Sequence, residues 1–165
     1  MPRLSVEPGI FSDFKAAGEA IVEVLYSRLP FDLWMITRVQ DDDWIVLVAE
    51  DHGYNVEPGT IFKWSESFCH HMVKGDLPLI APQSDIVLPY ASALIGRKIK
   101  IGAYIGMPLV NPDGSLFGTL CAIHPSPLPP AIVDEEPLVR VFAALLSTLI
   151  AREPHPAVAG GLHRE

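Results

Sequence analysis

The segment from residue 99 to 124 constrains the fold more than any other part of this chain. It reads as two strands joined by a tight turn at 111–114 (NPDG), where proline suits the first central position and glycine tolerates a positive φ. Both faces of the first strand are apolar: Ile101, Ala103, Ile105, Met107 and Leu109 on one, and Tyr104, Pro108 and Val110 on the other. A hairpin with one wet face would alternate apolar and polar residues. We therefore expect it at the centre of an antiparallel sheet that is covered on both sides.

The two glycines on this strand suggest where a pocket could begin. Gly102 and Gly106 flank Tyr104 and leave room beside it on one covered face. Room on a covered face, rimmed by a few polar groups, is the usual origin of a small-molecule site.

The composition excludes several classes of protein. The 165 residues suffice for one domain, and 49% hydrophobic with 19% charged residues is typical of a globular chain. A net charge of −8 argues against nucleic-acid and acidic-membrane partners. No apolar run reaches the roughly 18 residues of a membrane span, and the first residues lack a signal-peptide core. We expect a cytoplasmic protein whose two cysteines are reduced thiols.

The remaining elements follow from periodicity and from helix caps. Residues 10–29 carry an apolar stripe that Ser12 or Asp13 can cap, and residues 33–39 and 44–50 form a hairpin. A short helix is expected from Ser65 or Ser67 to residue 74, stopped by Gly75. A strand at 77–82 and a connection with helical turns at 84–98 precede the central hairpin. A second long helix spans 130–152, with Asp134, Glu135 and Glu136 in its first turn.

This order predicts an α+β fold in three layers. The two long helices share one face of the sheet, and the short helices and loops cover the other. We expect an N-terminal extension at 1–9, a single domain at 10–152, and a disordered tail or linker at 153–165.

The pattern resembles the GAF domain, a ligand-binding sensory module. Five segments carry the resemblance: 64–76 (WSESFCHHMVKGD), 80–82 (IAP) with 89–91 (PYA), 95–97 (IGR), 101–109 (IGAYIGMPL) and 113–123 (DGSLFGTLCAI). Together they are similar to a bacterial subgroup often joined to diguanylate cyclase (GGDEF) output domains. The resemblance implies a GAF-like central antiparallel sheet of five to six strands. It also implies a terminal-helix bundle often used for dimerisation, and a pocket on the opposite face.

Cys69 is the candidate for thiol chemistry, although a cysteine flanked by Phe68 and Met72 is more often a small buried hydrophobe. Free methionine-R-sulfoxide reductases of the GAF family resemble the chain in having a cysteine near this position. They also use a cysteine just before the central hairpin, where residues 90–100 contain none, and Cys121 lies on a different strand. The bilin anchor of phytochromes and the signature of cyclic-nucleotide-binding GAF domains are not found. No metal-ligand spacing stands out.

A pocket between the sheet and the short helices would be lined by residues from four segments. These are Trp64, Cys69, Met72, Asp85, Tyr90, Arg97, Gly102 and Tyr104. Alternatively, Trp64, Met72 and Tyr104 simply fill a core and no ligand binds.

Three functions remain open from the sequence. We expect a non-enzymatic sensory domain that binds an unidentified small molecule and signals through a homodimer of the terminal helices. The alternatives are a thiol-based redox sensor or methionine-sulfoxide-reductase-like enzyme using Cys69, and an interaction module with a filled core.

Overall fold

A central sheet organises the computed structural model, which describes residues 13–75, 77–87, 90, 95, 99–152 and 163–164. Six antiparallel strands lie in the order β4-β5-β6-β1-β2-β3. Their bounds are β1 (Leu33–Gln40), β2 (Asp43–Asp51), β3 (Thr60–Lys63), β4 (Ile80–Ala81), β5 (Ala103–Val110) and β6 (Leu116–His124). The predicted α+β fold with an antiparallel sheet of five to six strands is confirmed. Two residues of the predicted tail, β7 (His163–Arg164), add a short parallel pair beside β3.

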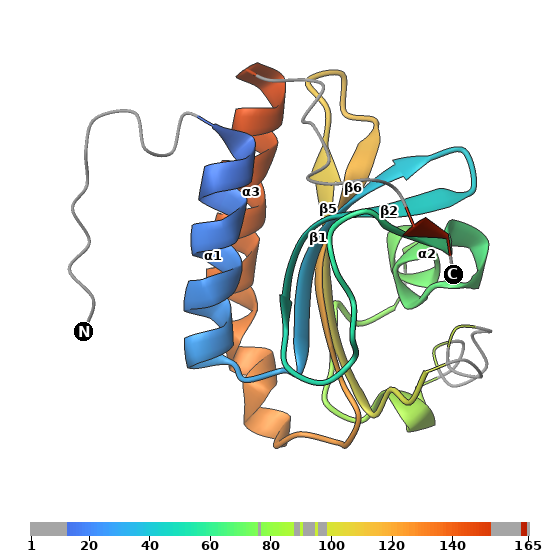
Figure 1. Ribbon diagram of the computed structural model, residues 1–165. Coiled ribbons are helices and arrows are strands. Elements are labelled where there is room, and N and C mark those ends of the chain that lie inside the picture. Colours follow the sequence, from blue (N-terminus) through green and yellow to red (C-terminus); the bar gives the residue numbers. More distant parts are fainter. Residues whose placement is uncertain are drawn as a thin grey trace.

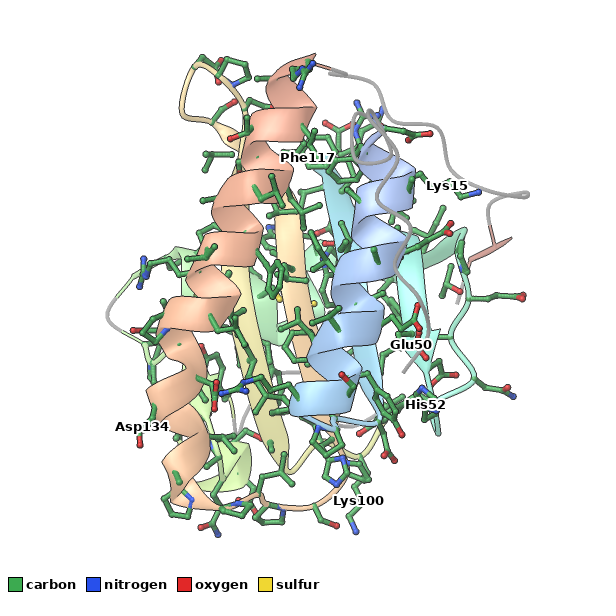
Figure 2. All side chains as sticks on the ribbon, turned by 90° about the vertical axis from the view of Figure 1, so that its left-hand side faces the viewer. Lys15, Glu50, His52, Lys100, Phe117 and Asp134 are labelled. Carbon is green, nitrogen blue, oxygen red and sulfur yellow. The ribbon has the colours of Figure 1, made fainter. Side chains whose placement is uncertain are left out.

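One face of the sheet is covered by the two long helices, as predicted (Figure 1). Helix α1 (Phe14–Arg28) and helix α3 (Glu136–Arg152) lie side by side and antiparallel. Arg28 at the end of α1 pairs with Glu135, just before α3, at 3.1 Å. Figure 2 looks onto this face and shows Phe117 of β6 near the start of α1, where its ring lies 5.8 Å from that of Phe14.

The opposite face is covered by short elements (Figure 1). They are η1 (Trp64–Glu66), helix α2 (Phe68–Val73) and η2 (Ser84–Ile86). A second hydrophobic core, separate from the one under α1 and α3, fills the space between these elements and the sheet. Most of both faces is therefore buried, which is the reason most residues of the central strands are apolar, although Pro108 and Val110 at the end of β5 are exposed.

Strand β5 contributes to both cores because its side chains alternate between the faces. Ile105 and Met107 pack beneath the long helices, whereas Tyr104 points toward α2. Ile101 corrects our assignment: it packs on the α2 side rather than with Ile105. The reason is that β5 begins only at Ala103, so two-residue alternation does not extend back to Ile101.

The local signals for helix ends were largely accurate. The Asp13 side chain caps α1 by accepting from the Lys15 amide, and Ser67 caps α2 by accepting from the His70 amide. The last helix differs, because residues 130–135 form a 3₁₀ helix (η5) and only Glu136 of the three acidic residues lies in the first α-helical turn.

Two strands differ from the prediction. Strand β3 was missed, since four residues next to a loop carry little periodicity. The predicted strand at 77–82 contains only two residues of regular strand. Within the described part of the chain, no helix combines the length and the apolar character needed to cross a membrane.

Candidate functional site

A small apolar cavity lies between the sheet and the α2 layer. Its volume is about 20 Å³, which is about the space of one water molecule. Four aromatic side chains, from β2, β3, α2 and β5, contribute to its wall. The lining residues are Leu33, Met35, Trp44, Phe62, Phe68, Ile95, Ile99, Ile101, Tyr104, Cys121 and Ile123.

The structure brings together five of the eight predicted site residues. These five are buried in the core between the sheet and α2: Trp64, Cys69, Met72, Tyr90 and Tyr104. Only Tyr104 among them lines the cavity.

The other three predicted residues do not meet there. Asp85 is exposed. A Cβ on Gly102 would meet the backbone of Pro125 and Ser126 at 2.7–2.8 Å, so Gly102 borders that segment instead of the cavity. Arg97 lies outside the described residues.

Aromatic packing closes the wall beside α2. The Phe68 ring stacks on Tyr90 at 5.2 Å and meets Tyr104 edge-on at 5.5 Å. The Tyr90 hydroxyl donates to the Pro78 carbonyl oxygen at 2.7 Å. Among the described residues, no buried side-chain nitrogen or oxygen lacks a hydrogen-bond partner. The cavity therefore offers shape and apolar contact rather than unsatisfied polar groups.

The sequence analysis missed a thiol pair beneath this wall. The Tyr104 hydroxyl donates to Sγ of Cys69 at 3.0 Å. Cys121 pairs with Gly106 across β5 and β6, so it shares the face of Tyr104 and lies near Cys69. Cys121 lies on β6 and not in the segment before β5, as expected, but the sequence analysis did not predict that it would lie near Cys69. Counting residues across the hairpin turn could have placed Tyr104 and Cys121 on one face.

A chain of buried hydrogen bonds leads to these thiols from Trp44, near the start of β2. The Trp44 indole N–H donates to Oγ1 of Thr37 at 2.8 Å, and that hydroxyl lies 2.7 Å from Oγ1 of Thr119. The Thr37 oxygen also accepts from the Thr119 amide, so its own proton points to a Thr119 oxygen. Thr119 Oγ1 then donates to Sγ of Cys121 at 3.6 Å.

The two thiols differ in acidity. Burial raises the pKa of Cys69, but hydrogen bonds from Cys121, Tyr104 and Thr119 together lower it to below its usual range. Burial, followed by the hydrogen bond to Cys69, raises the pKa of Cys121 well above its usual range. Cys69 is therefore the thiol that gives up its proton more easily.

The neighbouring histidines do not supply the positive charge that usually acidifies a thiol. Burial and the Lys74 charge lower the pKa of His70, and burial with the charge of His70 lowers that of His71. Both are neutral at pH 7, so hydrogen bonds rather than cations act on Cys69. Within the described ranges, no three His, Cys, Asp or Glu side chains are grouped to hold a metal ion.

Comparison with known structures shows the same fold in proteins of low identity. The free methionine-R-sulfoxide reductase of Neisseria meningitidis, solved with its substrate, is 17% identical with a TM-score of 0.65, covering 87% of this chain and 83% of that one. The GAF domain of an Acinetobacter phosphoenolpyruvate-protein phosphotransferase is 13% identical with a TM-score of 0.68, covering 86% and 84%. The chromophore-binding domain of a bacteriophytochrome from R. palustris is 15% identical with a TM-score of 0.64, covering 87% and 58%.

Among curated proteins, no sequence matches this chain significantly. The model of the GAF domain family matches residues 13–150. That match takes in α1, α2, all six antiparallel strands and nearly all of α3. The chain belongs to the GAF domain family.

Proposed function

We propose that the chain is a non-enzymatic, cytoplasmic sensory domain that binds a small, largely apolar molecule between the sheet and α2. The supporting observation is the cavity of about 20 Å³, walled by Trp44, Phe62, Phe68 and Tyr104. Two proteins of the same fold bind small molecules: the Neisseria reductase was solved with its substrate, and the bacteriophytochrome domain is a chromophore-binding domain. At its present size the cavity admits a ligand only if the side chains that line it move apart.

Native mass spectrometry of freshly purified protein tests the binding step. We expect a co-purifying mass that disappears in Ile123→Phe, which fills the cavity, and persists in Val133→Phe, which adds the same ring at an exposed position on η5. A wild-type protein with no bound mass, or a bound mass retained equally by both variants, would contradict ligand binding in this cavity.

Signalling is proposed to run through a homodimer of α1 and α3. An apolar groove of about 140 Å³ lies between these helices, lined by Ala20, Ile21, Val24, Phe142 and Leu145. Val24, Val141 and Leu145 are 45%, 65% and 41% exposed, although they are large and apolar. A second copy of the same helix pair would bury this surface.

Strand β5 connects the ligand layer with the dimer layer. Tyr104 lies against the cavity, its neighbour Ile105 lies under the helices, and the Val110 amide donates to Oγ of Ser147 on α3 at 3.1 Å. A shift of β5 on ligand binding would thus move α3. Analytical ultracentrifugation tests the assembly: Leu145→Glu should convert a dimer to a monomer, whereas Val133→Glu should not.

The chain is proposed to belong to the bacterial GAF subgroup often joined to diguanylate cyclase (GGDEF) output domains, because the segments at 64–76, 80–82 with 89–91, 95–97, 101–109 and 113–123 together resemble it. A second candidate function, reduction of a sulfoxide by Cys69, is favoured by the lowered pKa of that thiol and by the Neisseria relative. Loss of free methionine-R-sulfoxide in the presence of dithiothreitol, abolished in Cys69→Ser, would support the enzyme over the sensor.

A further inference from the structure

We propose that Cys69 and Cys121 form a redox-active pair, which a small hydroperoxide oxidises to an intramolecular disulfide linking α2 to β6. This inference does not rest on ligand binding or on dimerisation. It starts from the position of the two thiols, which are 0% and 1% exposed. Cys69 accepts from the Tyr104 hydroxyl, which lies over Gly106, and Gly106 is the cross-strand partner of Cys121.

The directions of the buried hydrogen bonds make the Cys69 sulfur the last acceptor in the series. The Thr37 oxygen accepts from Trp44 and from the Thr119 amide, which leaves its proton for Thr119. The Thr119 hydroxyl donates to Cys121, which leaves the Cys121 thiol proton available to Cys69. Tyr104 donates to the same sulfur from the other side. Donors thus converge on Cys69, an arrangement that stabilises its thiolate.

Gly106 makes this convergence possible. A Cβ at Gly106 would overlap the Tyr104 hydroxyl, so the missing side chain is what lets that hydroxyl lie over β5. Gly106 is also the cross-strand partner of Cys121. The Tyr104 hydroxyl and the sulfurs of Cys69 and Cys121 therefore lie around one cross-strand pair, Gly106 with Cys121.

The cavity supplies a route for the oxidant. Phe62, Ile99 and Ile101 line it and are partly exposed at the surface, and Cys121 and Tyr104 line its inner wall. Cys69 does not line the cavity, so the oxidant reaches it past Tyr104, which donates to the Cys69 sulfur. A space of about one water molecule is closer in size to hydrogen peroxide, a small neutral hydroperoxide, than to a bulky oxidant.

The chemistry balances with hydrogen peroxide as the two-electron oxidant. The Cys69 thiolate attacks one peroxide oxygen, the O–O bond breaks, and the departing hydroxide takes up a proton to form water. The Cys121 sulfur then attacks the sulfenic acid on Cys69, an S–S bond forms, the S–O bond breaks, and a second water leaves with the Cys121 proton. Two thiols and one peroxide become one disulfide and two waters.

Intact-mass spectrometry of the full chain, after treatment with hydrogen peroxide and alkylation in denaturant, tests the pair. Wild type should lose the mass of two hydrogen atoms and take up no alkyl group. Cys121→Ser should stop at a sulfenic acid on Cys69 that dimedone traps, and Cys69→Ser should keep an unoxidised Cys121.

Tyr104→Phe separates this proposal from a purely structural role for the thiols. It keeps the ring and removes a hydrogen-bond donor to the Cys69 thiolate, so disulfide formation should slow by about tenfold. Circular dichroism before oxidation confirms that each variant is folded. Wild-type thiols that stay reduced in excess peroxide, disulfides only between chains, or equal oxidation of the two single variants would each overturn the proposal.

Discussion

Gly106 and Tyr104, two residues apart on β5, occupy one space between them: the Tyr104 hydroxyl lies where a side chain at position 106 would be. Gly106→Ala should therefore displace Tyr104 and break its hydrogen bond to Cys69. Overpacking of this kind costs about 1–3 kcal/mol of unfolding free energy. Urea denaturation measures it, and the cost should be smaller in a Tyr104→Phe background, which lacks the overlapping oxygen. Equal costs in both backgrounds would show that the clash lies elsewhere.

Thr37 holds the buried hydrogen-bond chain together. Its oxygen accepts from the Trp44 indole and the Thr119 amide, and its side chain is fully buried. Thr37→Val should cost about 1–3 kcal/mol for each buried donor left without an acceptor. Thr148→Val on the exposed side of α3 is the matched control and should stay within about 0.5 kcal/mol. A wild-type-like Thr37→Val would mean that both donors find other acceptors.

The six-residue helix α2 depends on its cap. Ser67 Oγ accepts from the His70 amide at 3.0 Å and donates to the Trp64 carbonyl oxygen at 2.7 Å. Ser67→Ala should cost about 1 kcal/mol and should speed maleimide labelling of Cys69, because α2 opens more often. Ser27→Ala at the exposed end of α1 should change neither quantity. An unchanged rate of maleimide labelling of Cys69 in Ser67→Ala would show that the helix cap does not control access to this thiol.

The paired histidines of α2 give the stability a pH dependence. The pKa values of His70 and His71 are lowered from 6.5, mainly by burial, so the unfolded chain binds protons more readily near that pH. Unfolding free energy should therefore fall as the pH drops from 7.5 through 6.5 toward the lower folded values. Urea denaturation across this range measures the slope, which His71→Gln should reduce. A stability that rises on acidification would reverse the assigned direction.

The aromatic and thiol residues of the site were only partly predictable from the sequence. Trp64, Cys69, Met72, Tyr90 and Tyr104 share one buried layer. Strand parity on β5 places Tyr104 there, and the helix period of α2 places Cys69 and Met72 there, both readable from the sequence. Gly102 and Asp85 lie away from the cavity. Whether a loop glycine faces a cavity or another loop depends on where residues 125 and 126 pass, and no local pattern encodes that path.

The amino-acid sequence alone determined the layers of this protein, since helix caps, turn residues and apolar periodicity are local properties that do not depend on long-range contacts. Asp13, Ser67 and the turn at 111–114 all have the roles that their chemistry indicates. Only the tertiary structure decided that Cys69 and Cys121, 52 positions apart, would meet under Tyr104. That meeting depends on the register of β5 with β6 and on how α2 packs over them. Both are set by the fit of the whole core rather than by any one segment.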